Sequence, residues 1–275
     1  MKRLDIRNPF SAPVYHEGTV GSTMEIARIL AAKGEPHGTV IAADFQEAGR
    51  GRIRDRKWDS EKGKNLLFTV LLRYSRAEDI PPALTLKAGL AMSLAIEDFA
   101  PALAGRVKIK WPNDVLILSD FLTQRRRDVE MKRKENVGRK ICGIYTEAEG
   151  GNVFLGIGVN VAQEKFPDAL LNKATSIKLC LDNGNEPDKF FLLEKILTRL
   201  HEALDPENNN EYWHERINDR LYKKNEKVSF AEGAAGSEKI VTGALEGISP
   251  NGELNILPDG ENTVRSFITG ELLIL

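Results

Sequence analysis

Two apolar, strand-length runs joined by a segment rich in glycine and arginine constrain the fold most strongly. The runs are residues 39–44 and 65–72, and the segment Gln46–Trp58 between them contains Gly49, Gly51 and four arginines. Apolar runs of this length, bounded by glycine, predict buried strands. Glycine lets a backbone approach a ligand closely, and arginine holds carboxylate or phosphate in two places at once. The sequence therefore predicts a sheet with an anion-binding loop between two strands; the alternative is a solvated basic loop.

Helices are expected on either side of these strands. Ser22 begins Ser-Thr-Met-Glu, the pattern of a capping box in which Ser22 is the N-cap and Glu25 returns the hydrogen bond. An apolar helical face follows, and Gly34 is a natural end for this helix. A second, longer helix is predicted from Pro81-Pro82 to about Phe99, because apolar residues recur there at helical spacing.

The pattern changes towards the C-terminus. Residues 189–222 have helical periodicity, whereas short apolar runs separated by glycine turns begin after Lys224. The expected strands are 228–230, 239–248, 253–257, 264–267 and 272–275. The predicted class is α+β, with a large domain over residues 1–222 and a small β-barrel domain over residues 223–275.

Composition excludes several classes of protein. Net charge is −1, from 39 basic and 40 acidic residues, which argues against general binding to nucleic acid or to a membrane surface. Cys142 and Cys180 form no C-x-x-C pair, and the four histidines show no metal-ligand spacing. The charged N-terminus does not resemble a signal peptide, and no apolar run has the ~20 residues that span a bilayer. We expect a cytoplasmic protein.

Five motifs occur in the order typical of biotin protein ligases, and this family is the one that the chain resembles. The motifs are Gly21-Ser-Thr23, Gly49-Arg-Gly-Arg52 with Arg56-Lys-Trp58, Lys110-Trp-Pro-Asn-Asp114, Arg139-Lys-Ile-Cys-Gly-Ile144 and Gly156-Ile-Gly-Val-Asn160. The resemblance implies a mixed sheet with helices, as in class II aminoacyl-tRNA synthetase-like catalytic domains, followed by an SH3-like β-barrel. It also implies the form of the family that lacks an N-terminal DNA-binding domain.

The resemblance further implies a reaction and its participants. Such enzymes activate biotin with ATP and Mg²⁺ to biotinyl-5′-AMP, and then transfer biotin to a lysine of a biotin carboxyl carrier protein domain of a carboxylase. The expected partners are therefore ATP, biotin and the carrier domain, without DNA or membrane, in a monomer or homodimer. No dedicated metal ligands are expected, since one carboxylate and one amide suit a hydrated Mg²⁺.

Site residues follow from matching the motifs one by one. The resemblance implies that Lys140 and Arg52 are catalytic, with Lys140 reaching the biotin carboxylate and the α-phosphate. The implied biotin-binding residues are Ser22, Thr23, Gln46, Arg50, Gly51, Arg52, Lys140 and Gly143. The implied ATP-binding residues are Arg52, Trp58, Lys110, Asn113, Asp114 and Asn160.

Structural explanations stay open at several of these positions. Ser22 and Thr23 can serve only as caps, Asn113 and Asp114 are common turn formers, and a lysine at the start of a strand is ordinarily a surface charge. The chain also departs from the family pattern. Met24 replaces the usual asparagine, and the arginine segment is one residue longer and lacks its third glycine, which leaves open whether Arg54 or Arg56 takes the later role.

A charged insertion over residues 119–138 also departs from the family pattern, and its mixed charge predicts an exposed loop or a frayed helix. The strands after it, 140–147 and 152–160, are expected to form a hairpin. Three alternative functions remain at this point: a lipoate-protein ligase of similar fold and chemistry, a nucleic-acid-binding protein, and an inactive paralogue that only binds biotin.

Overall fold

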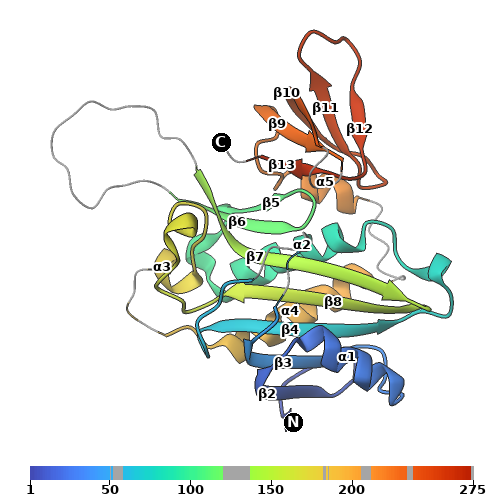
Figure 1. Cartoon of the computed structure of the whole chain (residues 1–275), viewed down its shortest axis with the longest axis vertical. Coiled ribbons are helices and arrows are strands. Elements are labelled where there is room, and N and C mark those ends of the chain that lie inside the picture. Colours follow the sequence, from blue (N-terminus) through green and yellow to red (C-terminus); the bar gives the residue numbers. More distant parts are fainter. Residues whose placement is uncertain are drawn as a thin grey trace.

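Two β-sheets organise the chain, and helices cover both faces of the larger one (Figure 1). The computed structural model describes residues 1–49, 51, 58–119, 137–181, 184, 186–205, 212–233 and 238–273. The larger sheet has eight strands in the order β1-β2-β3-β4-β8-β7-β6-β5. They are β1 (Lys2–Leu4), β2 (Val14–Val20), β3 (Thr39–Gln46), β4 (Asn65–Arg73), β5 (Val107–Lys110), β6 (Asp114–Ser119), β7 (Val137–Glu149) and β8 (Asn152–Asn160). Among the described strands of this sheet only β2 and β3 pair in parallel, so the predicted mixed sheet is confirmed.

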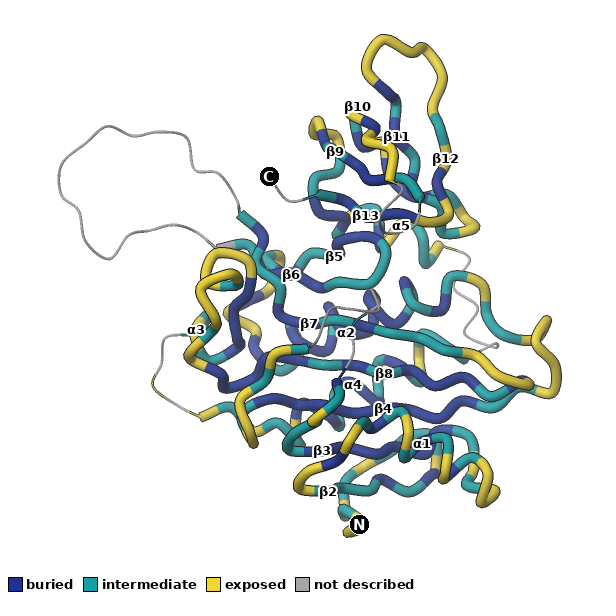
Figure 2. The backbone as a smooth tube through the Cα atoms, viewed as in Figure 1, coloured by how far each residue is buried: buried dark blue, intermediate teal, exposed yellow. Residues whose placement is uncertain are grey.

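Strand β4 lies in the middle of the larger sheet, and both of its faces are buried. Its tube is dark blue along most of its length in Figure 2. Val70 and Leu72 pack in the core cluster beneath α2 (Leu84–Phe99) and α4 (Lys189–Leu204). Leu71 points to the opposite face and packs with Ala27 and Leu30 of α1 (Thr23–Ala32). A strand buried on both faces has a continuous apolar sequence, which is why residues 65–72 predict it so clearly.

The first helix begins as expected but is capped differently. Ser22 is the N-cap, its Oγ accepts a hydrogen bond from the backbone of Met24, and Gly34 lies just beyond the last turn with φ +84°. The predicted return bond from Glu25 does not form. Gln46 of β3 approaches instead, and its Oε1 accepts from the Thr23 backbone N–H at 2.7 Å. A donor at the helix start is therefore satisfied from a neighbouring strand, which sequence periodicity cannot anticipate.

The second sheet is antiparallel and lies beyond the β5–β6 end of the first (Figure 1). Its order is β12-β11-β10-β9-β13, with β9 (Lys227–Glu232), β10 (Lys239–Ile248), β11 (Leu254–Pro258), β12 (Arg265–Phe267) and β13 (Glu271–Leu272). Phe230 and Leu245 share one apolar cluster with Ile109 and Trp111 of the larger unit. The Trp111 Nε1 also donates to the Gly252 carbonyl at 3.0 Å. The two sheets are thus joined by a common core.

Shorter helices complete the described fold. They are α3 (Ile177–Leu181) and α5 (Trp213–Asn218). Ser119 pairs with Val137, so the two ends of the charged insertion are neighbours, while residues 120–136 themselves lie outside the described residues. Within the described part of the chain, no helix is long and apolar enough to cross a membrane.

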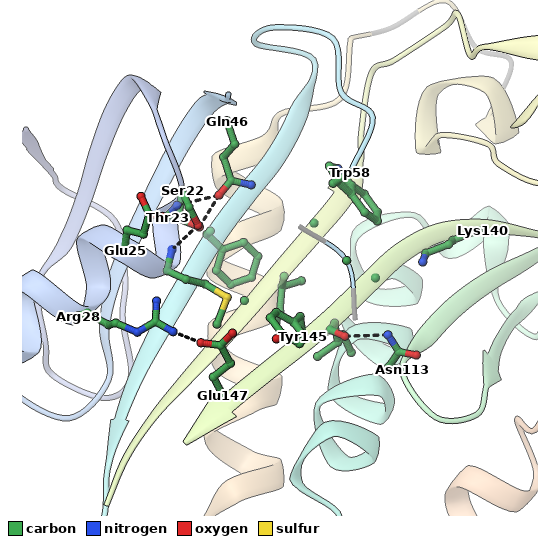
Figure 3. A pocket seen from close by; sticks show the side chains of 18 residues that line it. Ser22, Thr23, Glu25, Arg28, Gln46, Trp58, Asn113, Lys140, Tyr145 and Glu147 are labelled. Atoms are coloured by element: carbon green, nitrogen blue, oxygen red, sulfur yellow. Dashed lines mark hydrogen bonds and ion pairs between the residues drawn. The ribbon is translucent and has the colours of Figure 1, made fainter. Parts of the chain in front are cut away.

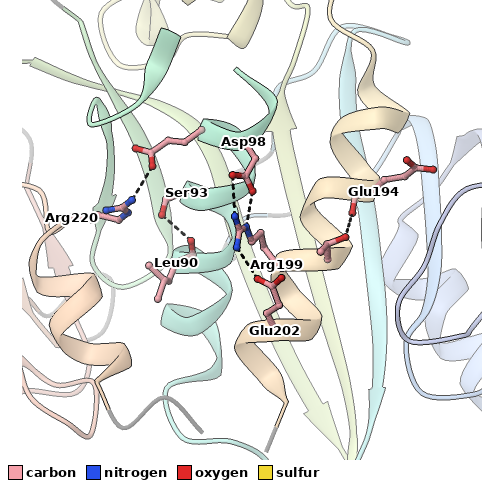
Figure 4. Close-up of polar contacts among 9 residues, drawn as sticks. Leu90, Ser93, Asp98, Glu194, Arg199, Glu202 and Arg220 are labelled. Atoms are coloured by element: carbon pink, nitrogen blue, oxygen red, sulfur yellow. Dashed lines mark hydrogen bonds and ion pairs between the residues drawn. The ribbon is translucent and has the colours of Figure 1, made fainter. Parts of the chain in front are cut away.

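An ion pair joins α2 and α4, the two helices that cover one face of the larger sheet (Figure 4). Arg199 of α4 donates to both oxygens of Asp98 of α2, at 2.6 and 3.0 Å. The hydrogen bond from Arg199 is the main cause that lowers the pKa of Asp98 below its usual 3.8. A carboxylate with a lowered pKa stabilises the fold above its unfolded-state pKa, and that contribution is lost as pH falls through the folded-state value.

We therefore expect Asp98→Asn to reduce the free energy of unfolding by up to about 1 kcal/mol at pH 7. The difference from wild type should shrink below pH 4, because the wild-type carboxylate becomes protonated there. Urea unfolding at pH 7 and pH 3 measures both values. A difference that stays constant or grows on acidification would contradict this account.

Candidate active site

Two cavities lie side by side over the strands of the larger sheet. The first has a volume of about 130 Å³ and lies between α1 and strands β7 and β8. The second, of about 520 Å³, extends towards the C-terminal sheet. Four residues line both cavities: Gly51, Trp58, Asn113 and Lys140. A ligand in one cavity would therefore meet a ligand in the other beside these side chains.

A hydrogen-bonded set of polar groups marks one end of the first cavity (Figure 3). The Thr23 hydroxyl lies 3.0 Å from the Gln46 Oε1 and 2.8 Å from the hydroxyl of Thr69 in β4. Because the Gln46 Oε1 also accepts from the Thr23 backbone, its amide has a fixed orientation. Thr23 is 2% exposed, so this end of the cavity presents preorganised polar groups inside an apolar wall. Thr69 lies in the middle of the run 65–72, which is otherwise polar only at Asn65, and this is the sequence signal for its place beside Thr23.

The same cavity has a mixed wall along α1 and β7. Arg28 of α1 forms an ion pair with Glu147 of β7, and the guanidinium also lies 5.2 Å from the centre of the Phe154 ring. Met24, which replaces the family's usual asparagine, packs over Gly156: its Sδ is 3.0 Å from where a Cβ at that glycine would lie. Position 24 therefore supplies an apolar contact to the cavity. Motif matching missed Arg28, Tyr145 and Glu147, which also line it.

A β-bulge directs Lys140 into the site. Along β7, Gly143, Tyr145 and Glu147 line the first cavity, so strict alternation would turn Ile141 towards the cavity and Lys140 towards the core. The pairing instead shifts by one residue, with Val115 opposite Cys142 and Leu116 opposite Lys140. Ile141 and Cys142 are consequently both buried in the core, and Lys140 takes the cavity face. Bulges commonly redirect a side chain next to a functional site.

Lys140 meets one carboxylate and one aromatic ring there. Its Nζ lies 2.6 Å from the Asp114 Oδ1 and 5.4 Å from the centre of the Trp58 ring. The backbone of Lys140 is held on its other side by bonds to Lys173 and Thr175. The ammonium is thus positioned at the boundary of the two cavities, with an anion beside it.

Trp58 lies across a pair of glycines that face each other on β7 and β8. A Cβ built at Gly143 would lie 2.7 Å from the Trp58 ring, and one built at Gly158 would also lie 2.7 Å from it. No side chain fits at either position without moving the indole. The glycines of two separate motifs therefore form a flat floor that seats Trp58 between the cavities.

The second cavity combines a buried cation with polar groups from turn and strand ends. Lys110 is 6% exposed, and its Nζ lies 4.0 Å from the Glu271 Oε1 of the C-terminal sheet. Asn113 is held by its side-chain bond to the Ile144 carbonyl, at 2.9 Å. Asn160 ends β8, is 4% exposed and donates to the Thr175 carbonyl at 3.0 Å. Cationic and amide groups around a cavity of this size suit a polyanionic ligand.

Each described residue for which the motifs imply a ligand lines the cavity expected for it, and some line both. Ser22, Thr23, Gln46, Gly51, Lys140 and Gly143, expected to bind biotin, all line the first. Trp58, Lys110, Asn113, Asp114 and Asn160, expected to bind ATP, all line the second. Arg50 and Arg52 lie outside the described residues, as do Arg54 and Arg56.

Two other chemistries have little support in the described residues. Cys142 is buried as the sequence predicts, and burial raises the pKa of its thiol strongly, so it stays protonated and unreactive. In the part of the chain that the structure describes, no group of three or more His, Cys, Asp or Glu side chains could hold a metal ion.

Comparison with known proteins places this site in a family. The sequence model of the biotin/lipoate A/B protein ligase family matches residues 20–163. The bifunctional ligase/repressor BirA of Bacillus subtilis is 35% identical over 195 residues, which cover 67% of this chain and 51% of that protein. The chain thus spans about half the length of this relative. The biotin–[acetyl-CoA-carboxylase] ligase of Mycobacterium tuberculosis is 32% identical, over 66% of this chain and 59% of the relative.

A solved structure extends the similarity to nearly the whole chain. The biotin protein ligase of Aquifex aeolicus, in complex with biotin and ATP, superposes with a TM-score of 0.74 at 26% identity. The match covers 94% of this chain and 97% of that one, so it includes both sheets. The α+β fold of this family is therefore the fold of this chain.

Proposed function

The chain belongs to the biotin/lipoate A/B protein ligase family, and we propose that within this family it is a biotin protein ligase. In this proposal biotin occupies the first cavity and ATP the second. The support that matters most is the position of Lys140, which borders both cavities at the place where the two ligands would meet. The Mycobacterium relative and the Aquifex structure, both of which are named as biotin ligases, favour biotin over lipoate.

The proposed reaction has two steps. A carboxylate oxygen of biotin bonds to the α-phosphorus of ATP, and the bond from that phosphorus to its bridging oxygen breaks, releasing pyrophosphate. The amine of a carrier-domain lysine then bonds to the acyl carbon, loses a proton and displaces AMP. Two anions approach one another in the first step, so cationic groups are what the site must supply.

Lys140 and Lys110 meet that electrostatic requirement. Lys140 would leave Asp114 to contact the biotin carboxylate and the α-phosphate as negative charge builds up between them. Lys110, buried in the second cavity, would offset the charge of the nucleotide. Neither step needs a protein nucleophile, in agreement with the protonated state of Cys142.

Mg²⁺ fits the site only as a companion of the nucleotide. Asp114, whose Oδ1 lies 2.6 Å from the Lys140 Nζ, and the neighbouring amide of Asn113 are among the residues that line the second cavity. Magnesium commonly takes one or two carboxylates together with substrate phosphates and water. When bound, it would neutralise phosphate charge, and Asp114 would help to hold it.

The remaining assignments extend the same proposal. Ser22, Thr23, Gln46, Gly51 and Gly143 would hold biotin, and Trp58 and Asn160 would contact the nucleotide. Arg50 would bind biotin, and Arg52 would be a catalytic residue that contacts both biotin and ATP; the sequence motif supports both roles. Residues 1–222 would form the catalytic domain and residues 223–275 the SH3-like domain.

The acceptor would be a lysine of a biotin carboxyl carrier domain of a carboxylase; the Mycobacterium relative is named for joining biotin to acetyl-CoA carboxylase. An ATP-dependent reaction and two unpaired cysteines, Cys142 and Cys180, suit the cytoplasm.

Pyrophosphate exchange tests the proposal directly. We expect the purified chain to exchange labelled pyrophosphate into ATP only when biotin is present, because biotin supplies the carboxylate that attacks the α-phosphorus. Lipoate at the same concentration should give no exchange. Exchange with lipoate and none with biotin would show that the substrate assignment is wrong.

A further inference from the structure

Gln163 is a buried amide whose hydrogen-bonding groups are all used, although it lines neither cavity. It follows β8 by three residues and is 1% exposed. Its Nε2 donates to the Asp59 Oδ2 at 3.0 Å and to the Lys165 carbonyl at 2.9 Å. Its Oε1 accepts from the Asn65 side chain and from the Glu61 backbone. A neutral side-chain amide has two N–H donors and an oxygen that can accept two hydrogen bonds, so it matches these four partners.

These partners join two parts of the wall of the second cavity. Asp59 lines that cavity and directly follows Trp58, at the C-terminal end of the arginine segment. The Trp58 backbone N–H donates to the Gly49 carbonyl at 3.2 Å and so closes the base of the segment. On the other side, Phe166 lies one residue beyond Lys165 and also lines the second cavity.

Asn65 provides the fixed point of this arrangement. It is fully buried at the start of β4, and its Oδ1 accepts from the Val161 backbone at 3.3 Å. Gln163 therefore ties the exit of the arginine segment and the Phe166 wall to the most buried strand of the sheet. Neither Asp59 nor Phe166 lines the first cavity, so the two wall residues that this link holds belong to the second cavity alone.

We propose that Gln163 is a positioning residue for the nucleotide: it holds Asp59 and the Phe166 wall where the second cavity needs them. This inference rests on the proposed function, in which that cavity takes ATP. It predicts a selective effect. Loss of the Gln163 amide should weaken ATP binding and leave biotin binding in place.

Two variants separate the amide's polarity from its volume. Gln163→Leu keeps similar bulk and removes all four bonds. Gln163→Glu keeps the shape and the accepting oxygen but loses both donors and places a second carboxylate 3.0 Å from the Asp59 Oδ2. Calorimetric titrations with ATP alone and with biotin alone, at a temperature where each variant is folded, measure the two dissociation constants.

We expect the Kd for ATP to rise about tenfold in both variants, the equivalent of roughly one net hydrogen bond. The Kd for biotin should stay within about twofold. Asn8→Ala is the matched control, because Asn8 is also a bridging amide, with bonds to Ala12, Gly38 and Phe10, but lies away from both cavities. It should lower stability without changing either Kd.

The ATP affinity of a double variant gives a second test, because a merely structural role of Gln163 does not predict that it recovers. Adding Asp59→Asn to Gln163→Glu exchanges donor and acceptor, so that the new asparagine can donate to the new carboxylate. The double variant should recover part of the lost ATP affinity, whereas Asp59→Asn alone should lose some.

Two results would overturn the proposal: an unchanged Kd for ATP in Gln163→Leu, or equal weakening of ATP and biotin. Failure of the function is distinguishable from either. A wild type that binds ATP but shows no biotin-dependent exchange would refute the ligase, while the ATP titrations would still decide the role of Gln163. A wild type that binds no ATP would refute both.

Discussion

Replacing Lys140 with alanine should slow formation of biotinyl-AMP by about 10²–10³-fold, the usual effect of losing one group that stabilises transition-state charge. The ammonium lies at the boundary of the two cavities, 2.6 Å from Asp114, and no other described cation lines both. Binding of biotin alone should change much less, because the polar end of the first cavity, at Thr23 and Gln46, stays intact. Single-turnover formation of the adenylate, measured with saturating ATP and biotin, gives the rate.

The free energy of unfolding shows whether Lys140→Ala loses activity only because it is less stable. Lys140 is about one-third exposed, so removing its ion pair should cost no more than about 1 kcal/mol of unfolding free energy. Lys227→Ala removes an ion pair of similar length but greater exposure, with Asp259 on the C-terminal sheet, and should leave the rate unchanged. A rate loss under about fivefold for Lys140→Ala, with biotin affinity unaltered, would reduce Lys140 to a surface charge.

Gly143→Val should cost about 10²-fold in kcat/KM without unfolding the protein. A Cβ at this position would lie 2.7 Å from the Trp58 ring and 3.1 Å from the Lys140 Nζ, so both groups must move. A displacement of about 1 Å in a catalytic group is enough for a loss of this size. The backbone itself should accept valine, because Gly143 lies within β7 and is not among the glycines with positive φ.

Gly18→Val is the matched control, since Gly18 also lies within a strand, β2, and has no atom within 4 Å of its would-be Cβ. It should leave kcat/KM unchanged. Near-normal turnover in Gly143→Val would show that Trp58 and Lys140 are not held in place by the glycine floor.

Much of the fold was determined by local sequence. The run 65–72 is apolar at nearly every position, which only a strand buried on both faces requires, and β4 occupies that place. The hairpin of β7 and β8 was likewise predictable, because the two glycines between its strands take the positive φ that its turn needs. Gly34 ends α1 for a similar reason. These features depend on residues within a few positions of one another, and sequence patterns report such neighbours directly.

Tertiary structure decided how the site is assembled. Alternation along β7 would have turned Lys140 into the core, and only its pairing with β6, which inserts the bulge, brings it to the cavity face. The capping of α1 by Gln46 and the seating of Trp58 on two glycines join positions far apart in sequence. Three of the four bonds of Gln163, to Asp59, Glu61 and Asn65, do the same and match none of the motifs. Such contacts depend on strand register and on which residues the sheet places opposite each other, and a one-residue shift changes all of them.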